Sequence, residues 1–508
     1  MAIAVVLLSE GLAFRPAPDR SSLAFCVNLP PRPSLPDCMP SLVVPSTRKQ
    51  VLSLAIPALG EQLLNFTVAL YDTFLAGYIS TGGHETGIYT TTVGIASYLG
   101  WLASLLFALV GTGTTALVAR ARGREDLGEA NRFANRSLLL VAPLAVLIVL
   151  ALYSAAPVLA SRAGLSGESA RILTNYLRTD ALGQLLFGFC LVGAAALRGM
   201  GDMRTPMWIL GGVNLFNMLV ATALVFGTRA DSPLHSWAGL VGSWDSWGVS
   251  GIVSGTLSAR LAGGACMLWV LARGISGLRL SPALLIPDTD DLRRILRVGL
   301  PAALEGVTLW TGQWLFLEII SQLGSDADGS AYKAAHMIGM DAEALTYLPA
   351  TAWGYAAASL VGRNLGANRP AEARAVTHEA ARQALVIALI GTLVYFFGAE
   401  VIYQVMSREE PVRVIGAPAL RFLSWYQVPL ATVIVYLQAI RGAGDTRAVL
   451  LINFLGFFLV RLPIAWWLGI HLQLGLIGAW SGMSIDVLCR AIVAGIYFAR
   501  GGWARTAL

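Results

Sequence analysis

The sequence predicts an all-α polytopic membrane protein, with about 12 transmembrane helices in two six-helix repeats related by a pseudo-twofold axis along the membrane normal. Of its 508 residues, 56% are hydrophobic and 13% are charged, and its mean hydropathy is +0.65. These values lie outside the range of soluble proteins. The octapeptide LRGMGDMR at Leu197–Arg204 returns as IRGAGDTR at Ile440–Arg447, and such a recurrence indicates two copies of one unit.

Two further pairs of segments repeat at nearly the same spacing. LVARARG begins at Leu117 and LVGRNLG at Leu360, and IPALGE near Pro57 matches LPAALE near Pro301. We therefore expect an N-lobe at 46–275 and a C-lobe at 276–508, each with six helices. Residues 1–45 contain eight prolines. They are expected to form a disordered tail, a targeting segment, or a stretch upstream of a true start at Met39.

From Val51 onward, long apolar runs recur, and each is compatible with the roughly 20 residues that a spanning helix needs. The runs are continuously apolar and do not alternate, so helices are expected and a lipid-exposed sheet is not. The spans are placed at about 51–79, 88–118, 135–160, 174–197, 204–227, 248–272, 296–323, 331–361, 380–406, 414–439, 447–470 and 475–499.

Lys and Arg gather in alternate loops. Arg120, Arg122 and Arg124 follow the second span, whereas the next loop holds Arg162 and Arg171. By the positive-inside rule this bias places both termini on the cytoplasmic side of a plasma (inner) membrane. An even number of spans in each half inserts both halves the same way round, with any substrate site between them near the midplane. The first half is expected to carry extra residues in the outside loop near Arg229–Trp247.

Several functional classes find no support in the sequence. The net charge of +6 comes mostly from Arg in short turns, which is typical of loops beside a bilayer and not of a nucleic-acid interface. No Walker loop is present, and the cysteines show no spacing typical of a metal or redox site. We therefore predict no enzymatic activity, no cofactor and no metal beyond a coupling ion, and we expect a monomer.

The residues of most interest are ionisable groups at membrane depth, because they are costly there and usually face a cavity or an ion path. Asp72 lies in the first span with no basic residue within a turn along the chain. Burial disfavours its charged form, so it is a candidate for exchanging a proton against a cation. The alternative is an internal hydrogen bond to a neighbour such as Asn217. Other basic residues could neutralise some of these acids, namely Arg178, Arg260, Arg421, Arg461 and Arg490.

Three glutamates are further candidates for ion coupling. Glu61 and Glu305 each stand four residues after a proline at matching repeat positions, and such symmetry also suits a structural role. Glu343 stands one turn from Tyr347 and close to Pro349, where a proline kink can open backbone groups to a cavity. Two aromatic residues, Tyr71 and Trp314, are candidates for binding a flat organic cation by cation–π contact.

The RGxGDxR turns are placed at the junction of the fourth and fifth spans of each half. Their glycines permit a tight turn, and Asp202 and Asp445 can cap the helix that follows. The arginines of the turns, Arg198, Arg204, Arg441 and Arg447, can meet headgroups or pair with these aspartates. The favoured interpretation is a hinge and topological anchor beside a gate, and the alternative is direct contact with substrate.

Taken together, these segments resemble the multidrug and toxic compound extrusion (MATE) transporters. The resemblance rests on PALGEQLLNFTVALYDTFLAG at Pro57–Gly77, LVARARG, LVGRNLG, AAHMIG at Ala334 and the two RGxGD turns, and covers about residues 50–500. It implies two six-helix lobes around a cleft that opens alternately to the two sides. It also implies export of organic cations or other drug-like solutes, cationic and amphiphilic, against protons or sodium.

The resemblance extends to single residues. Asp72 matches the first-helix carboxylate that the family uses for coupling, with a possible Na⁺ near it, and Asn217 matches the Asn of an N-x-x-x-D pattern on the fifth helix. Ala221 stands where that Asp is expected. Asp72 therefore works with Asn217 alone, or coupling is shared with Glu343, and the ion is H⁺ or Na⁺.

Two other functions are weighed against cation export. Relatives in the same superfamily flip lipid-linked precursors, but the sequence places eight acids against five arginines in mid-span positions, and this balance favours cations. An integral-membrane enzyme or receptor would need a clustered catalytic set or a large soluble domain. The sequence shows neither.

Overall fold

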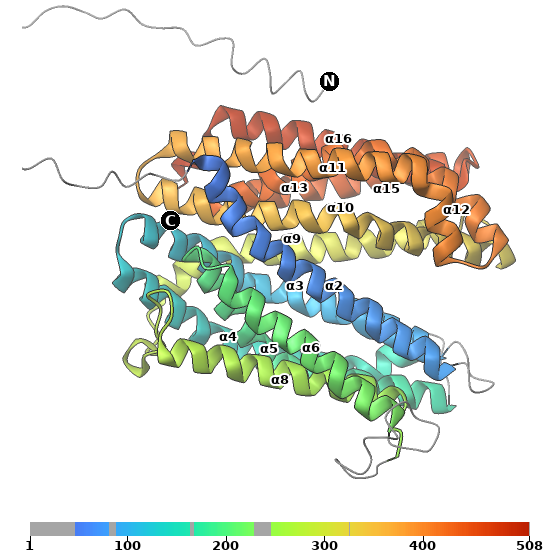
Figure 1. Cartoon of the computed structure of the whole chain (residues 1–508), viewed down its shortest axis with the longest axis horizontal. Helices are drawn as coiled ribbons and strands as arrows, with labels where there is room; N and C mark the ends of the chain where they lie inside the picture. Colours follow the sequence, from blue (N-terminus) through green and yellow to red (C-terminus); the bar gives the residue numbers. More distant parts are fainter. Residues whose placement is uncertain (1–45, 81–87, 163–166, 228–244, 325, 507–508) are drawn as a thin grey trace, which may run out of the picture. The chain divides into compact units, whose positions relative to one another are not determined.

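The computed structural model describes residues 46–80, 88–162, 167–227, 245–324 and 326–506. The predicted tail at 1–45 and most of the extra outside loop lie outside the described residues. The described part is helical throughout, as Figure 1 shows. Its helices are α2 (Thr47–Ser80), α3 (Ile88–Gly123), α4 (Leu127–Arg162), α5 (Gly167–Gly199), α6 (Arg204–Phe226), α8 (Val249–Arg273), α9 (Thr289–Ser321), α10 (Asp326–Gly366), α11 (Pro370–Met406), α12 (Glu410–Leu423), α13 (Gln427–Gly442), α14 (Thr446–Leu455), α15 (Leu462–Trp466) and α16 (Gly475–Arg500).

Some of these helices join into longer rods. A 3₁₀ turn at Ser424–Tyr426 links α12 to α13, and π-helical turns at Gly456–Arg461 and Trp467–His471 flank α15. In the described part of the chain, ten helical segments are long and apolar enough to cross a membrane. Two further long helices, α9 and α10, carry acidic residues in their middle. The predicted fold class of two six-helix membrane repeats is confirmed.

Several predicted helix ends are wrong, because the helices run on into polar stretches. The second span was expected to end at 118, but α3 continues to Gly123, and α4 begins at Leu127 where 135 was expected. The ninth span was expected from 380, but α11 begins at Pro370. Apolar runs mark the part of a helix that lies in lipid, and they do not report turns that extend into water or headgroups.

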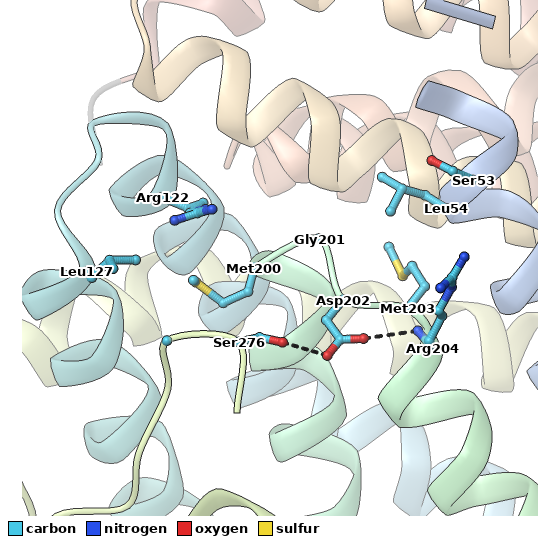
Figure 2. Close-up of a pocket in the computed structure, with 11 residues that line it drawn as sticks. Ser53, Leu54, Arg122, Leu127, Met200, Gly201, Asp202, Met203, Arg204 and Ser276 are labelled. Carbon is cyan, nitrogen blue, oxygen red and sulfur yellow. Dashed lines mark hydrogen bonds between the residues drawn. The ribbon is translucent and has the colours of Figure 1, made fainter. Parts of the chain in front are cut away.

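The two RGxGD turns have the same local structure. Gly201 and Gly444 have φ values of 79° and 87°, in the left-handed region that glycine adopts without steric cost. In Figure 2, Asp202 accepts from the backbone N–H of Arg204 at 3.1 Å and from the Ser276 hydroxyl at 2.7 Å. Asp445 accepts from the backbone N–H of Ala448 at 3.3 Å. Asp445 is the N-cap residue of α14, as the motif predicts. The N-cap position of α6 is Met203, and Asp202, one residue earlier, accepts from the backbone N–H groups of Arg204 and Thr205.

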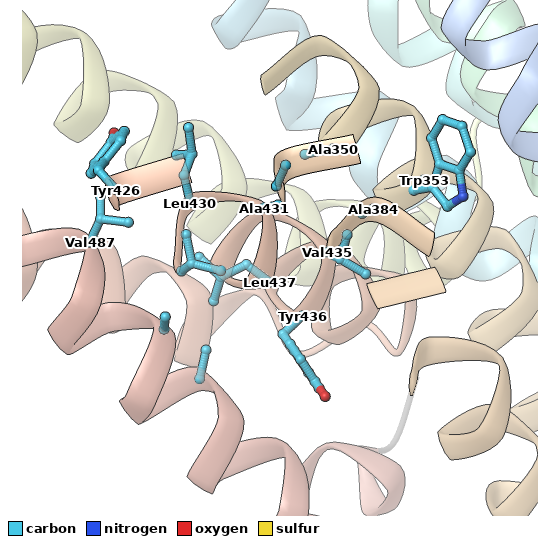
Figure 3. Packing of buried hydrophobic residues seen from close by; sticks show 14 of the residues in the cluster. Ala350, Trp353, Ala384, Tyr426, Leu430, Ala431, Val435, Tyr436, Leu437 and Val487 are labelled. Atoms are coloured by element: carbon cyan, nitrogen blue, oxygen red, sulfur yellow. The ribbon is translucent and has the colours of Figure 1, made fainter. Parts of the chain in front are cut away.

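The hydrophobic interior forms three clusters. Two of them lie in the first half of the chain, one built around Phe107 and Phe133 and the other around Leu75 and Tyr176. The third joins α10–α16, and Figure 3 shows part of it, with Ala431 and Val435 of α13 beside Ala350 of α10 and Ala384 of α11. Each half of the chain therefore has its own core.

Two helices belong to both cores. The first part of α2, with Val51 and Ala55, packs in the third cluster, whereas its last part, with Leu75, packs in the first half. In α9, Ile295 packs in the first half and Phe316 in the third cluster. Figure 1 shows α2 crossing obliquely between the two groups of helices. The crossing of α2 and α9 thus joins the halves at the end that carries the RGxGD turns, which we call the turn end. Farther along, α3 and α9 are also joined by hydrogen bonds between Tyr98 and Trp310.

Candidate functional site

A cavity of about 800 Å³ lies between the two halves. Residues of α2, α3, α5, α6 and α8 line one side, and residues of α9, α10 and α13 line the other. Its volume suits a small organic molecule. The charged residues that line it are Glu61, Asp72, Asp180, Arg198, Arg260, Glu305 and Arg441.

Asp72 and Asn217 line this cavity from α2 and α6. The Oδ1 atom of each is buried, and neither atom has a hydrogen-bond partner among the described residues. The internal hydrogen bond to Asn217, which is the alternative role of Asp72, is not among the hydrogen bonds of the described residues. Buried polar atoms are normally satisfied, so these two oxygens, together with Glu61 Oε2 in the same cavity, indicate that a proton, an ion, a water or a ligand completes the site.

Asp180 and Arg260 form an ion pair beside Asp72. Arg260 Nη1 lies 2.8 Å from Asp180 Oδ1 and 3.3 Å from the Asp180 carbonyl oxygen. Gln184 Nε2 donates to the other carboxylate oxygen of Asp180 at 3.2 Å, and the guanidinium lies 5.2 Å from the ring centre of Phe187. Arg260 attracts the charge of Asp72, whereas Asp180 repels it. Arg260 was one candidate among several to neutralise an acid, and only the fold identifies its partner.

The other cavity charges form two symmetric pairs. Arg198 pairs with Glu61 in the first half, and Arg441 pairs with Glu305 in the second, with Arg441 Nε 3.1 Å from Glu305 Oε2. Both arginines come from the RGxGD motifs. The prediction that they meet headgroups or pair with the motif aspartates is therefore wrong, because they turn inward to the glutamate of the first helix of their own half. Ion coupling through Glu61 and Glu305 stays a prediction.

Glu343 lies apart from this cavity, in a buried polar cluster of the second half. Its side chain lies near Tyr426 and Arg461. Arg461 and Arg490 hold Asp486 between them, at 2.9 and 2.7 Å. The structure does not bring Glu343 to Asp72, and the shared coupling expected of these two residues stays a prediction.

The two aromatic candidates do not line the cavity. Trp314 is half-exposed on the outer face of α9, and at 3.6 residues per turn it lies on the side of the helix opposite to Glu305. The Tyr71 hydroxyl is paired with that of Thr222. The placement of both residues in the substrate cavity is therefore corrected.

The aromatic side chains that line the cavity are those of Trp101, Phe107, Tyr176, Phe187 and Tyr355. A sequence signal for part of this wall exists in α3. Ser97, Ser104, Gly111 and Thr115 recur at helical spacing among apolar residues and all line the cavity. Small and weakly polar residues at that spacing are typical of a helix face turned away from lipid.

Comparison with known proteins identifies the family. The family model MatE matches residues 57–222 and 301–467. A protein of Thermotoga maritima named probable multidrug resistance protein NorM is 28% identical over 431 residues, which cover 84% of this chain and 88% of the relative. The multidrug resistance protein MdtK of Proteus mirabilis is 23% identical over 84% of this chain and 90% of its own length.

Solved structures show the same fold. A multidrug resistance MATE family transporter of the MOP superfamily, in an outward-facing conformation, superposes with a TM-score of 0.78 at 21% identity, covering 89% of this chain and 95% of the other. A MOP superfamily transporter from Pyrococcus furiosus gives 0.78 at 21% identity, covering 91% and 97%. Since the family model matches both halves of the sequence and the fold agrees, the chain belongs to the MATE family of transporters.

Proposed function

We propose that this protein is a secondary active efflux transporter that exports organic cations or drug-like solutes by antiport against protons or sodium. One observation carries the proposal. Asp72 places a carboxylate with one buried oxygen, and without an ion-pair partner among the described residues, in a cavity of about 800 Å³ between the two halves. Such a carboxylate binds a proton or a cation, and competition between the two couples their movements.

Two further findings support the proposal. Relatives that match most of this chain are named multidrug resistance proteins, and the two halves share contacts through α2 and α9 at the turn end. Rocking of one half against the other would open the cavity alternately to the two sides of the membrane. In this proposal the turn end is cytoplasmic, and the protein lies in the plasma (inner) membrane.

A flippase for lipid-linked precursors gains no support from the cavity. A pyrophosphate group is recognised by an excess of positive charge. Each of the arginines that line the cavity, Arg198, Arg260 and Arg441, is paired with a carboxylate. Among the described lining residues no arginine is left unpaired for an anion, and this supports a cation as the cargo.

The proposal is tested with everted membrane vesicles and ethidium, a fluorescent organic cation. A proton gradient and a sodium gradient are imposed separately, each with the inside of the vesicle at the higher concentration. We expect one gradient to drive uptake of ethidium, and we expect Asp72→Asn to abolish that uptake. Glu400→Gln, which removes an exposed acid on α11, is the matched control and should behave as wild type. Uptake that is insensitive to both gradients, or unchanged in Asp72→Asn, would contradict the proposal.

A further inference from the structure

The charges that line the cavity nearly cancel. Seven charged residues line it, and six of them form three ion pairs, Glu61 with Arg198, Asp180 with Arg260 and Glu305 with Arg441. Each pair is neutral as a unit. Asp72 is the one lining charge in the described part of the chain that belongs to no ion pair.

The surroundings of Asp72 add no second uncompensated charge. From α5 it faces Asp180 and the uncharged hydroxyl of Tyr176, and from α8 it faces Arg260. From α6 the lining residue Asn217 is neutral. The described lining residues of α3 and α10 carry no charge, and Glu61, farther along α2, is paired with Arg198.

Arg260 is bound by its own carboxylate, that of Asp180. Two acceptors of Asp180 bind its Nη1 atom, and its stem passes over Gly183, where a built Cβ would lie 3.1 Å from Arg260 Cδ. A side chain at this position of α5 would push the guanidinium out of place. Asp180 therefore compensates the charge of Arg260, and Asp72 stays available for an exchangeable cation.

We infer that the Asp180–Arg260 pair keeps Asp72 as the single uncompensated charge of the cavity, so that the protein exchanges one proton for one monovalent cation without moving net charge. This inference rests on the proposed function. An uncompensated charge is costly where a carboxylate oxygen is removed from water, as Asp72 Oδ1 is. Two states of the cavity are therefore favoured: Asp72 protonated with no substrate, and Asp72 ionised with one positive charge bound. When the cation arrives, the proton leaves the carboxyl oxygen of Asp72. Anions and dications would leave the cavity charged in either state.

The stoichiometry is measured in proteoliposomes with an acidic lumen and ethidium outside. The membrane potential is clamped with potassium and valinomycin, and liposomes without protein give the background. A one-to-one exchange accumulates ethidium about tenfold per pH unit at equilibrium, at every clamped potential. Accumulation of about a hundredfold per pH unit, or accumulation that follows the potential, would overturn the inference while leaving proton-coupled export intact. No accumulation with a pH gradient would instead overturn proton coupling.

Three variants test the role of the pair. Asp180→Asn leaves Arg260 without its carboxylate, so Arg260 compensates Asp72 and the transport rate should fall at least tenfold. Arg260→Gln adds Asp180 as a second uncompensated acid, so accumulation should rise above tenfold per pH unit and respond to the potential. The double variant Asp180→Asn/Arg260→Gln removes both charges and should regain one-to-one exchange. A merely structural pair would leave the double variant as impaired as Asp180→Asn, and Arg260→Gln with unchanged stoichiometry would also refute the inference.

Discussion

Single residues at membrane depth were predictable from the sequence, but their partners were not. Asp72, Glu61 and Glu305 stand out because acids are rare and costly within apolar runs. The partner of Glu61 lies 137 positions along the chain, and the partner of Glu305 lies 136 positions away. No local pattern relates residues at such separations. The pairing became visible only when the fold placed the RGxGD arginines beside the first helix of each half.

Among the single residues, Asp202 makes a pH-dependent contribution to the free energy of unfolding. Partial burial raises the pKa of its carboxyl, but hydrogen bonds from Thr205 and Ser276 outweigh that effect and hold the pKa below its ordinary value. The ionised form is therefore favoured in the folded state. The stabilisation that ionised Asp202 gives the folded state is complete at every pH above the ordinary pKa of an aspartate. It is lost as the pH falls through the lower pKa of the folded state.

We expect Asp202→Asn to unfold at a lower temperature than wild type, by about 2 °C at neutral pH, because the neutral amide loses the charge-assisted hydrogen bonds of the carboxylate, which contribute on the order of 1 kcal/mol. The difference should be constant between pH 8 and about pH 5, and it should shrink below about pH 4. Thermal unfolding of the purified protein in detergent, followed by tryptophan fluorescence, measures both. A difference that grew on acidification would show that the carboxyl is bound in its neutral form.

At the scale of elements, apolar runs located the helices but not their polar ends. The ends of α3 and α10 make a reciprocal contact at the turn end. A Cβ on Gly123 would overlap the carbonyl oxygen of Arg363. A Cβ on Gly366 would likewise overlap the carbonyl oxygen of Arg120. The sequence revealed these segments as a repeat, LVARARG and LVGRNLG, but it did not reveal that the two copies touch. A contact between repeats is a property of their assembly and leaves no trace in the periodicity of either copy.

This contact predicts the effect of adding a single methyl group. Gly123→Ala and Gly366→Ala should each separate the ends of α3 and α10, which would weaken closure at the turn end and reduce the rate of ethidium transport severalfold. Gly212→Ala on α6 is the matched control, since a Cβ there meets nothing within 4 Å. Transport is compared at equal protein levels in vesicles. Equal rates for Gly123→Ala and Gly212→Ala would show that the close approach of the two helices has no functional importance.

For the whole molecule, the duplicated sequence predicted two six-helix halves, but not the way in which they meet. α2 and α9 each pack in both cores, and further contacts join the halves at the turn end. Arg120 donates to the Ala443 carbonyl at 2.9 Å, and the Ser359 hydroxyl donates to the Arg198 carbonyl at 2.7 Å. A sequence that supports alternating access must encode more than one arrangement of its halves, so apolar patterning cannot single out this one.

Fixing the two halves together at the turn end should therefore stop transport. A Cβ on Gly201 would lie 4.0 Å from Ser359 Oγ, close enough for a disulfide after a small shift. We expect Gly201→Cys/Ser359→Cys to lose ethidium transport on oxidation and to regain it on reduction. Because Gly201 has a positive φ of 79°, Gly201→Cys alone controls for strain of about 1 kcal/mol, and Ser359→Cys alone controls for the lost hydrogen bond. Full transport by a cross-linked protein would show that the halves do not separate at the turn end during the cycle.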